Sequence, residues 1–427
     1  MSHQKFNEDA ELTQIQKEAF NYFANEINLS NGLIKDKTAE NWPASIAAVG
    51  FALASYPVAV ERGFISRAKA VERTLTTLRF FWNSKQGPEP DATGYNGFYY
   101  HFLDIQSGKR IWNCEISTID TTFLIAGMLT AAHFFDHKNP EEEEIRHLAE
   151  SLYQRVNWSW AQNSEYQITM GWKPEEGFLK YNWEGYDEAL LLFILGLGSP
   201  THPLDARSYD VWTNKYSWKK IFDIEYLYGG SLFIHQFSHI WIDFRNIKDK
   251  YMRDKNSDYF ENSKRATYVQ HQYAISNPLR YIGYNEKCWG ISASDGPGPI
   301  HKKIEGIQRC FYDYIARSAP FGPDDGTLAP WAAIASLPFA PEIILPLIDH
   351  YTHHLQLKCK HLYGFSATFN QTFKNDSQLG FWISPWHFGI NQGPIILMTE
   401  NYRTGLIWQL MRNCSYIKKG LKLAGFV

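Results

Sequence analysis

The chain has 427 residues, of which 44% are hydrophobic and 20% are charged, and its formal net charge is −3. This composition excludes a disordered chain, and the scattered Lys and Arg residues argue against a partner that is nucleic acid or an anionic membrane. Aromatic residues make up 16% of the chain, including 15 Trp. A core alone rarely needs so many rings, so this excess favours a protein that stacks them on sugars.

The N-terminus and the cysteines give further expectations. Residues 1–20 lack the apolar core of a signal peptide, so we expect a cytoplasmic protein, or a periplasmic or secreted one whose signal has been removed. The cysteines are far apart and never form a C-x-x-C pair, which predicts buried thiols rather than disulfides or a zinc site. They are Cys114, Cys288, Cys310, Cys359 and Cys414. We also expect a monomer that needs no cofactor.

Apolar residues recur mainly at helical spacing, first over Leu12–Phe23 and then over Ile46–Val60. Further helices are predicted over residues 66–82, 117–135, 141–158, 186–195, 230–244, 257–274, 304–316, 331–336, 342–357 and 394–412, which makes about twelve in all. Without a linker or a readable repeat, such a series must close on itself to bury both ends. The predicted fold is therefore all-α, an (α/α)6 barrel or toroid in a single domain over residues 1–427. An α-solenoid is the alternative, but it normally shows a repeat.

The first acidic region lies at the start of the helix predicted from Ser117. Glu115 precedes this helix and Asp120 lies in its first turn. One interpretation is that Ser117 caps the helix and both acids complement its dipole. The neighbouring Trp112 and His101 favour a functional site, because capping requires neither of them.

A second region combines indoles and acids before the helix predicted at residues 186–195. Trp172 is followed by the sequence Trp183-Glu-Gly-Tyr-Asp-Glu188, which contains Tyr186. Glu184 and Glu188 would share one helix face, where like charges destabilise each other, so we expect either that one is protonated or that the pair is functional. A glycosidase needs such an acid together with a second carboxylate. Glu188 is the predicted proton donor, and a surface acid that complements the helix dipole is the alternative.

His235 and His239 are four residues apart, a spacing that could bind zinc. No H-E-x-x-H motif and no third ligand accompany them, so we predict no metal site. Hydrogen bonds to sugar hydroxyls or to core neighbours are the expected roles, with Trp241 beside them.

Two loops bracketed by glycine follow, one with Trp289 and Asp295 and the other with Asp325. Each acid is either a turn-forming residue or a sugar ligand. The chain has no G-x-G-x-x-G, P-loop or G-x-S-x-G pattern, which removes the usual support for nucleotide binding and acyl transfer.

Several stretches together resemble the bacterial glucoamylase-like proteins grouped with endo-β-1,2-glucanases of glycoside hydrolase family 144, which are related to a domain of cyclic β-1,2-glucan synthases. These stretches are residues 97–104, 115–120, 183–188, 198–204, 234–245, 289–297 and 400–405. The resemblance implies an (α/α)6 barrel and a metal-independent hydrolase that acts on β-1,2-linked glucan with inversion. Glu188 falls in the family's Trp-x-Gly-Tyr-x-Glu stretch, and Tyr402 falls in the last matching stretch.

One departure from the family concerns the base. Where the family reads Ile-Asp-Gln-Gly-Pro, this chain reads Ile390-Asn-Gln-Gly-Pro394, and the amide of Asn391 cannot accept a proton at neutral pH. Either another acid such as Glu115, Asp120 or Asp295 acts, or hydrolysis is weak. A transglycosylase and a glycan-binding protein with reduced turnover are therefore the alternatives to a β-1,2-glucan hydrolase.

The predicted site contains two groups of residues. The predicted catalytic residues are Glu188, Glu115, Asp120 and Asn391. The predicted substrate-binding residues are Trp112, Trp172, Trp183, Glu184, Tyr186, His235, His239, Trp241, Trp289, Asp295, Asp325 and Tyr402.

Overall fold

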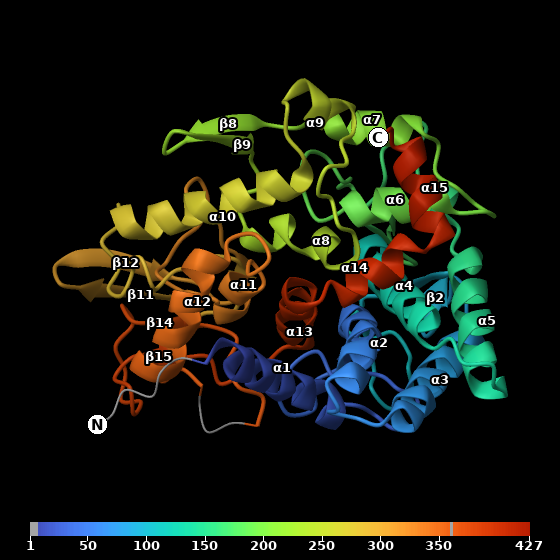
Figure 1. Ribbon diagram of the computed structural model, residues 1–427, viewed down its shortest axis with the longest axis horizontal. Helices are drawn as coiled ribbons and strands as arrows, with labels where there is room; N and C mark the ends of the chain where they lie inside the picture. Colours follow the sequence, from blue (N-terminus) through green and yellow to red (C-terminus); the bar gives the residue numbers. More distant parts are fainter. Residues whose placement is uncertain (1–6, 359–361) are drawn as a thin grey trace.

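The computed structural model describes residues 7–358 and 362–427, and this part of the chain is mostly helical (Figure 1). Its α-helices are α1 (Glu8–Asn25), α2 (Ile46–Glu61), α3 (Arg67–Asn83), α4 (Thr118–Phe134), α5 (Pro140–Arg155), α6 (Leu190–Gly198), α7 (Arg207–Thr213), α8 (Phe237–Trp241), α9 (Lys250–Asp254), α10 (Tyr259–Ser276), α11 (Pro330–Ile334), α12 (Pro341–Asp349), α13 (Gly389–Arg403), α14 (Leu406–Arg412) and α15 (Ser415–Leu423). Short helical turns are η1 (Trp158–Ala161), η2 (Leu232–His235) and η3 (His350–His354).

Short strands join these helices, so the expectation of an all-helical chain was incomplete. A five-stranded antiparallel sheet has the order β2-β3-β5-β6-β7, with β2 (Gly94–Tyr95), β3 (Phe98–Tyr100), β5 (Ile116–Ser117), β6 (Gly171–Lys173) and β7 (Gly177–Phe178). The two-stranded antiparallel pairs are β1 (Ala44–Ser45) with β4 (Phe102–Leu103), β8 (Trp218–Ile221) with β9 (Ile224–Leu227), β10 (Ala293–Ser294) with β13 (Ile315–Ala316), β11 (Ile300–Ile304) with β12 (Ile307–Phe311), and β14 (Phe369–Asn370) with β15 (Trp382–Ile383).

The helix predicted over residues 304–316 was wrong, because this segment contains strands β12 and β13 and the end of β11. Glu305 and Gly306 both have positive φ, at 49° and 81°, as a two-residue hairpin turn requires. Most other predicted helices are confirmed with shifted ends. The segment 394–412 divides into α13 and α14 at Gly405, whose φ is 72°, and the helix expected from Tyr186 begins only at Leu190.

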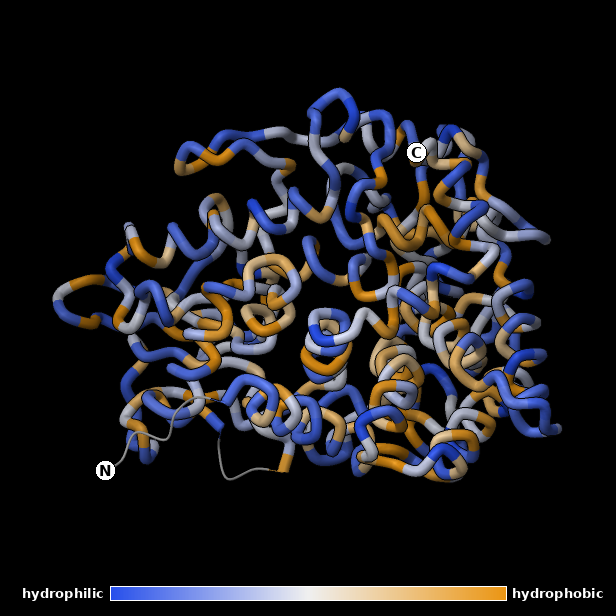
Figure 2. Tube along the Cα trace, in the orientation of Figure 1, coloured by the Kyte–Doolittle hydropathy of each residue, from blue (hydrophilic) through white to orange (hydrophobic). Residues whose placement is uncertain are grey.

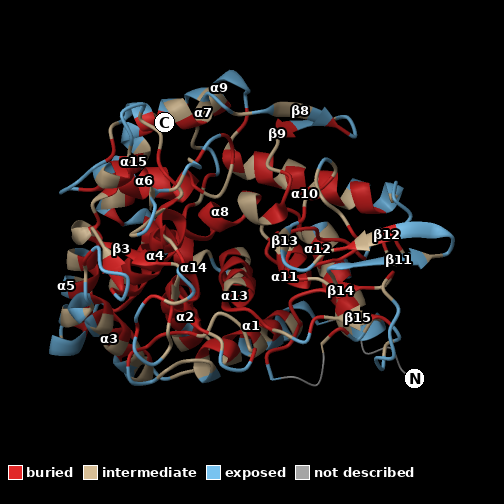
Figure 3. Ribbon diagram, turned by 180° about the vertical axis from the view of Figure 1, so that it is seen from behind, coloured by how far each residue is buried: buried red, intermediate tan, exposed pale blue. Residues whose placement is uncertain are grey.

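The core is centred on α2, α4 and α13. Figure 3 shows these helices as buried, whereas α5 and the β11–β12 hairpin lie at the exposed margin. Figure 2 shows the same contrast in hydropathy between α2 and α5. A Cβ atom on Gly127 of α4 would lie only 2.0 Å from the carbonyl oxygen of Gly50 in α2. Glycine at both positions therefore lets these two helix backbones touch.

The cysteine prediction is confirmed at three positions. Cys114, Cys288 and Cys414 are buried free thiols, and Cys310 is half-buried. Cys359 lies outside the described residues. None of the helices in the described ranges is long and apolar enough to cross a membrane.

Candidate active site

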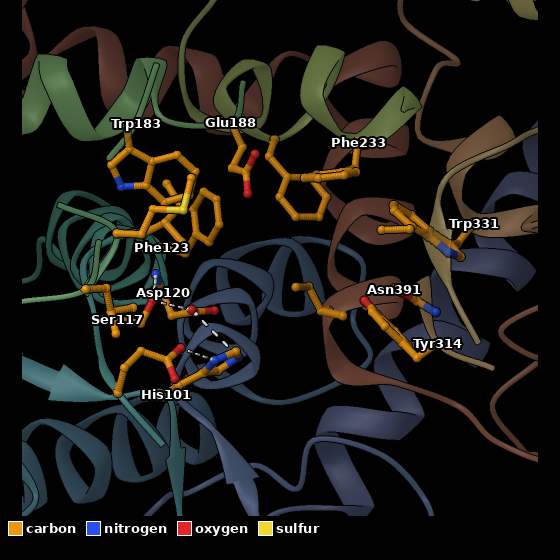
Figure 4. Close-up of a pocket in the computed structure, with 17 residues that line it drawn as sticks. His101, Ser117, Asp120, Phe123, Trp183, Glu188, Phe233, Tyr314, Trp331 and Asn391 are labelled. Carbon is orange, nitrogen blue, oxygen red and sulfur yellow. Dashed lines mark hydrogen bonds and ion pairs between the residues drawn. The ribbon is translucent and has the colours of Figure 1, made fainter. Parts of the chain in front are cut away.

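A cavity of about 350 Å³ lies where the N-terminal ends of α4, α11 and α13 and the segment before α6 converge (Figure 4). The polar side chains that line it are His101, Glu115, Ser117, Asp120, Glu188 and Asn391. Its apolar wall includes Phe123, Trp183, Phe233, Phe237, Tyr314 and Trp331. The structure thus brings together all four predicted catalytic residues, although they come from separate parts of the sequence.

The start of α4 places Asp120 among these polar side chains. Ser117 is the N-cap of α4: its Oγ accepts a hydrogen bond from the Asp120 backbone N–H at 3.1 Å. The same hydroxyl donates to Asp120 Oδ2 at 2.5 Å. The capping interpretation is therefore correct, and it does not exclude the functional one, because the capped turn holds the Asp120 carboxylate at the cavity.

His101 lies between Glu115 and Asp120 on one side of the cavity. Its Nδ1 is 2.9 Å from Glu115 Oε1, and its Nε2 is 3.7 Å from Asp120 Oδ2. Burial lowers the pKa of His101, but the charges of Asp120 and Glu115 outweigh it and raise the pKa to about 9. Burial likewise raises the pKa of Glu115, but the hydrogen bond and charge of His101 bring it below its ordinary value. At neutral pH this side of the cavity therefore holds an imidazolium beside the Glu115 carboxylate.

Glu188 approaches the cavity from the opposite side, as Figure 4 shows. It lies in the turn before Leu190, the first residue of α6. Burial raises its pKa to about 7, its own backbone N–H opposes this shift, and the charge of Asp120 adds to it. Near neutral pH this carboxyl is therefore poised between its protonated and ionised forms.

The prediction that Glu184 and Glu188 share a helix face was wrong. Gly185 has a φ of 82°, and the segment from Glu184 to the start of α6 at Leu190 is not helical. Glu184 is exposed, does not line the cavity, and accepts a hydrogen bond from Gln167 Nε2 at 2.5 Å. The electrostatic partner of Glu188 across the cavity is Asp120, which sequence spacing could not reveal.

Asn391 lies in the first turn of α13, is buried, and lines the cavity. In Figure 4 it lies near Tyr314 and Trp331, on the side of the cavity away from Trp183. The departure from the family pattern therefore falls inside the site.

Of the five Trp residues predicted to bind substrate, only Trp183 lines the cavity, where its Nε1 donates to Thr118 Oγ1 at 3.0 Å. Trp172 packs against Tyr95, with ring centroids 5.0 Å apart. Trp112 is 51% exposed and lies beside the cavity rather than in it.

Trp241 and Trp289 are core residues, with exposed fractions of 1% and 0%. The prediction missed Phe233, Tyr314 and Trp331, which line the cavity. Trp331 lies in a helix that was predicted, but no neighbouring acid marked it as a site residue.

The histidine pair is also part of the core. His235 and His239 are buried, and burial lowers the pKa of each to about 3. His239 Nε2 is 3.0 Å from Ser263 Oγ, and Tyr186 packs on His235 with ring centroids 5.2 Å apart. The predicted contacts of these residues with sugar were wrong, and the alternative of core neighbours holds. Within residues 7–358 and 362–427 no group of three or more His, Cys, Asp or Glu side chains could hold a metal ion.

The three remaining predicted residues lie outside the cavity lining. The Tyr402 hydroxyl donates to Glu8 Oε1 at 3.0 Å. Asp325 accepts two hydrogen bonds from the Arg317 guanidinium, at 2.9 and 2.8 Å.

Asp295 accepts from Ser384 Oγ at 2.5 Å and from Thr368 Oγ1 at 2.8 Å. Burial raises its pKa, although both hydroxyls oppose this shift. Asp295 and Asp325 therefore fix the loops that carry Ala293 and Tyr314, which line the cavity, and they are not themselves part of its wall.

Comparison with known proteins gives a consistent result. The sequence pattern of the family described as "Glycoamylase: Putative glucoamylase" matches residues 180–415. An exo-β-1,2-glucooligosaccharide sophorohydrolase (non-reducing end) from Parabacteroides distasonis is 27% identical over 446 residues, which cover 96% of this chain and 57% of the relative. The chain thus spans little more than half the length of that relative.

Two solved structures match along the whole chain. A protein described as a putative glucoamylase from Bacteroides uniformis is 31% identical, with a TM-score of 0.88 and coverage of 100% of this chain and 99% of its own. An endo-β-1,2-glucanase from Chitinophaga pinensis, solved with sophorotriose and glucose, is 25% identical, with a TM-score of 0.86 and coverage of 99% of both chains.

Proposed function

The chain belongs to the glycoamylase family, and from this premise we propose that it is a glycoside hydrolase that cleaves β-1,2-linked glucan. The relatives named as a sophorohydrolase and an endo-β-1,2-glucanase support this linkage. One observation carries the proposal: a carboxyl with a pKa of about 7 faces a carboxylate and an imidazolium across one cavity. Glycosidases use this pairing of a protonated acid and an ionised base.

We further propose that the helices form a single-domain (α/α)6 barrel around this cavity. Support comes from the central place of α13, which contacts α1, α2, α8, α11 and α14. The match to the Bacteroides uniformis structure over 100% of this chain also supports one continuous domain.

In the proposed reaction Glu188 is the general acid. Its proton moves to the glycosidic oxygen while the bond from that oxygen to the anomeric carbon breaks. A raised pKa suits this role, because the carboxyl must still carry its proton near neutral pH. The ring faces of Trp183, Trp331 and Phe233 provide apolar surfaces for a pyranose beside it.

Asp120 is the proposed general base. A water on the side opposite Glu188 attacks the anomeric carbon and loses its proton to Asp120, so the product has inverted configuration. Glu115 is less suited, since its Oε1 is held in a 2.9 Å hydrogen bond with His101, whereas Asp120 Oδ2 lies 3.7 Å from that ring. His101 is a positioning residue, whose cation holds both carboxylates in place.

An assay with glucans of defined linkage tests this function. Incubation of the protein with β-1,2-, β-1,3-, β-1,4- and α-1,4-linked glucans, followed by chromatography of the products, should show hydrolysis of the β-1,2 linkage. Proton NMR of the first product should show the α-anomer. The variant Glu188→Gln, which removes the proposed acid, should lose this activity. Its matched control is Glu184→Gln, which changes an exposed acid of the same loop and should retain activity. Release of sugars from another linkage alone would contradict the proposed substrate.

A glycan-binding protein with reduced turnover is a second candidate, because Asn391 places an amide where the family has a carboxylate. Binding of β-1,2-glucan without release of any product, even with added acceptor sugar, would favour this candidate. A longer product that forms only with an acceptor sugar would indicate transglycosylation.

A further inference from the structure

A row of side chains, here called the rim, lies beside the cavity. It consists of Trp112, Trp42, Lys37, Trp386, Phe388 and Tyr314. Ring contacts connect it to the cavity at both ends. At one end the ring centroids of Trp112 and Phe102 are 5.3 Å apart, and those of Phe102 and His101, which lines the cavity, are 3.9 Å apart. At the other end Phe388 lies 6.1 Å from Tyr314, which lines the cavity.

The middle of the rim is equally continuous. The Trp112 and Trp42 rings have centroids 4.8 Å apart. Lys37 Nζ lies 3.9 Å from the ring centroid of Trp42, 5.6 Å from that of Trp386 and 5.3 Å from that of Phe388. In the described part of the chain Lys37 makes cation–π contacts and no ion pair, so its N–H groups remain available as donors.

Backbone pairing holds these side chains side by side. Leu103 pairs with Ala44 and with Arg110, which lies two residues before Trp112. Ala44, two residues after Trp42, pairs in turn with Lys35. Further bridges link Lys37 with Phe388, and the Trp42 Nε1 donates to Asp36 Oδ2 at 3.0 Å. Backbone pairing thus ties together the segments that carry the rim, although Trp42, Trp112 and Trp386 themselves lie in the turns and loops beside these bridges.

Several rim side chains are exposed to solvent, unlike the side chains of a core cluster. Trp112 is 51% exposed and Tyr314 is 57% exposed, while Trp42 and Trp386 are half-buried. Trp112 has a φ of 60°, in the left-handed region that costs energy for a bulky residue. Trp42 also lines a second, polar hollow, and amide side chains suited to sugar hydroxyls line it as well, among them Asn28, Asn41 and Gln106.

From this arrangement we propose that the rim is a binding site for additional glucose units of a glucan whose cleaved linkage lies in the cavity. This inference rests on the proposed function. Flat indole faces can pack on the C–H faces of pyranose rings, and the Lys37 ammonium can donate to their hydroxyl groups. The rim runs from a point beside His101 to Tyr314. It therefore adds a surface on which the glucan can bind beyond the linkage that is cleaved.

The dependence of activity on chain length tests the rim. Wild type, Trp112→Ala and Trp112→Phe are compared on β-1,2-linked gluco-oligosaccharides of increasing length. The matched control is Trp82→Ala, which removes an indole that is 40% exposed and packs on Arg155, away from the cavity. Trp112→Ala should lower the ratio of kcat/KM between long and short oligosaccharides by about three- to tenfold, the usual worth of one aromatic contact. The change should appear in KM, Trp112→Phe should restore most of it, and Trp82→Ala should keep the wild-type ratio.

Two kinetic outcomes and one calorimetric outcome would overturn the proposed role of the rim, and a further outcome would overturn the proposed function alone. An unchanged ratio in Trp112→Ala, or an equal loss at every chain length, shows that the rim does not bind additional units. If wild type cleaves none of the oligosaccharides, the proposed function fails. Calorimetric affinities of wild type and Trp112→Ala for the same oligosaccharides then still test whether the rim binds additional units. A loss of affinity in Trp112→Ala that grows with chain length supports this role, and a loss that does not grow with length refutes it.

Discussion

Asp325 and Glu188 are both acids shielded from solvent, Asp325 completely and Glu188 in part, but their surroundings differ. Asp325 and Arg317 both have side-chain exposed fractions of 0%, and they form a two-point ion pair. In the described part of the chain Glu188 has no such cation, and the charge of Asp120 opposes its ionisation. A buried acid that is fully paired fixes a loop, whereas a half-buried acid without a counter-charge can keep a proton, as the role proposed for Glu188 requires. Burial alone does not mark a catalytic residue, and the partner of the acid decides its role.

Substitution of Glu188 gives the largest expected effect on rate. Glu188→Gln should lower kcat by roughly 10² to 10⁴-fold while substrate affinity is kept, because the amide cannot supply the proton. Steady-state kinetics and calorimetry on the same sample measure both quantities. Near-normal turnover would remove Glu188 from the role of acid.

The raised pKa of Glu188 also predicts a pH dependence. In wild type kcat/KM should fall as the pH rises through about 7, where Glu188 loses its proton. The pKa of Glu188 in the folded state lies above its ordinary value of 4.5, so ionising this carboxyl lowers the free energy of unfolding. This penalty is absent below pH 4.5 and reaches its full size above pH 7. Glu188→Gln should therefore raise Tm at pH 8, and the gain should shrink towards pH 4.5. A variant that melts lower than wild type at pH 8 would contradict this picture.

Substitution of Asp325 should act on stability instead. Asp325→Asn leaves the buried Arg317 charge without a counter-charge, which should lower the free energy of unfolding by about 3 to 5 kcal/mol. Urea unfolding followed by circular dichroism measures the loss. If Asp325→Asn were as stable as wild type but inactive, the distinction between paired and unpaired acids would fail.

His101 should have an intermediate effect. His101→Gln removes a cation that favours the ionised form of the carboxyl groups beside it, so the acidic limb of the kcat/KM profile should move to higher pH. A decrease in kcat of up to about 10²-fold is expected from lost positioning. His137→Gln, at an exposed histidine outside the cavity, is the control. A uniform loss without any shift of the pH profile would indicate a merely structural role for His101.

Asn391 should have a small effect. Asn391→Asp adds a carboxylate to a cavity that already has a candidate base in Asp120, so we expect little gain in hydrolysis or a modest loss. Initial rates on β-1,2-glucan measure it. A large gain over a nearly inactive parent would show that the base is missing in the native chain and would favour binding or transfer.

Metal removal should have the smallest effect of all. EDTA should leave hydrolysis intact, because the proposed mechanism uses only carboxyl groups and His101. Loss of activity that is restored by zinc or calcium would identify a metal requirement. Dialysis followed by an activity assay is sufficient to decide.

The sequence predicted most helices because their apolar spacing and caps are local properties. The start of α4 illustrates this, since Ser117 and Asp120 lie three residues apart and form the cap that the sequence indicated. The hairpin of β11 and β12 was missed although Glu305 and Gly306 provide a turn signal, because helical spacing was given more weight than the turn. Glu188, Glu115, Asp120 and Asn391 were found because acids beside aromatic residues and a family motif marked them.

The residues predicted wrongly share a physical cause. His235, His239, Trp241 and Trp289 have the chemistry of sugar ligands, but their side chains are buried and point into the core. A sequence gives the chemical groups and their local spacing, because these depend on neighbours along the chain. It does not give the direction of a side chain or its partner, because Arg317 for Asp325 and Asp120 for Glu188 are set by packing between distant segments. The sequence by itself therefore determined the helical class and the catalytic candidates, and only the tertiary structure decided which acids are paired, which face the cavity, and that Trp112 lies on its rim.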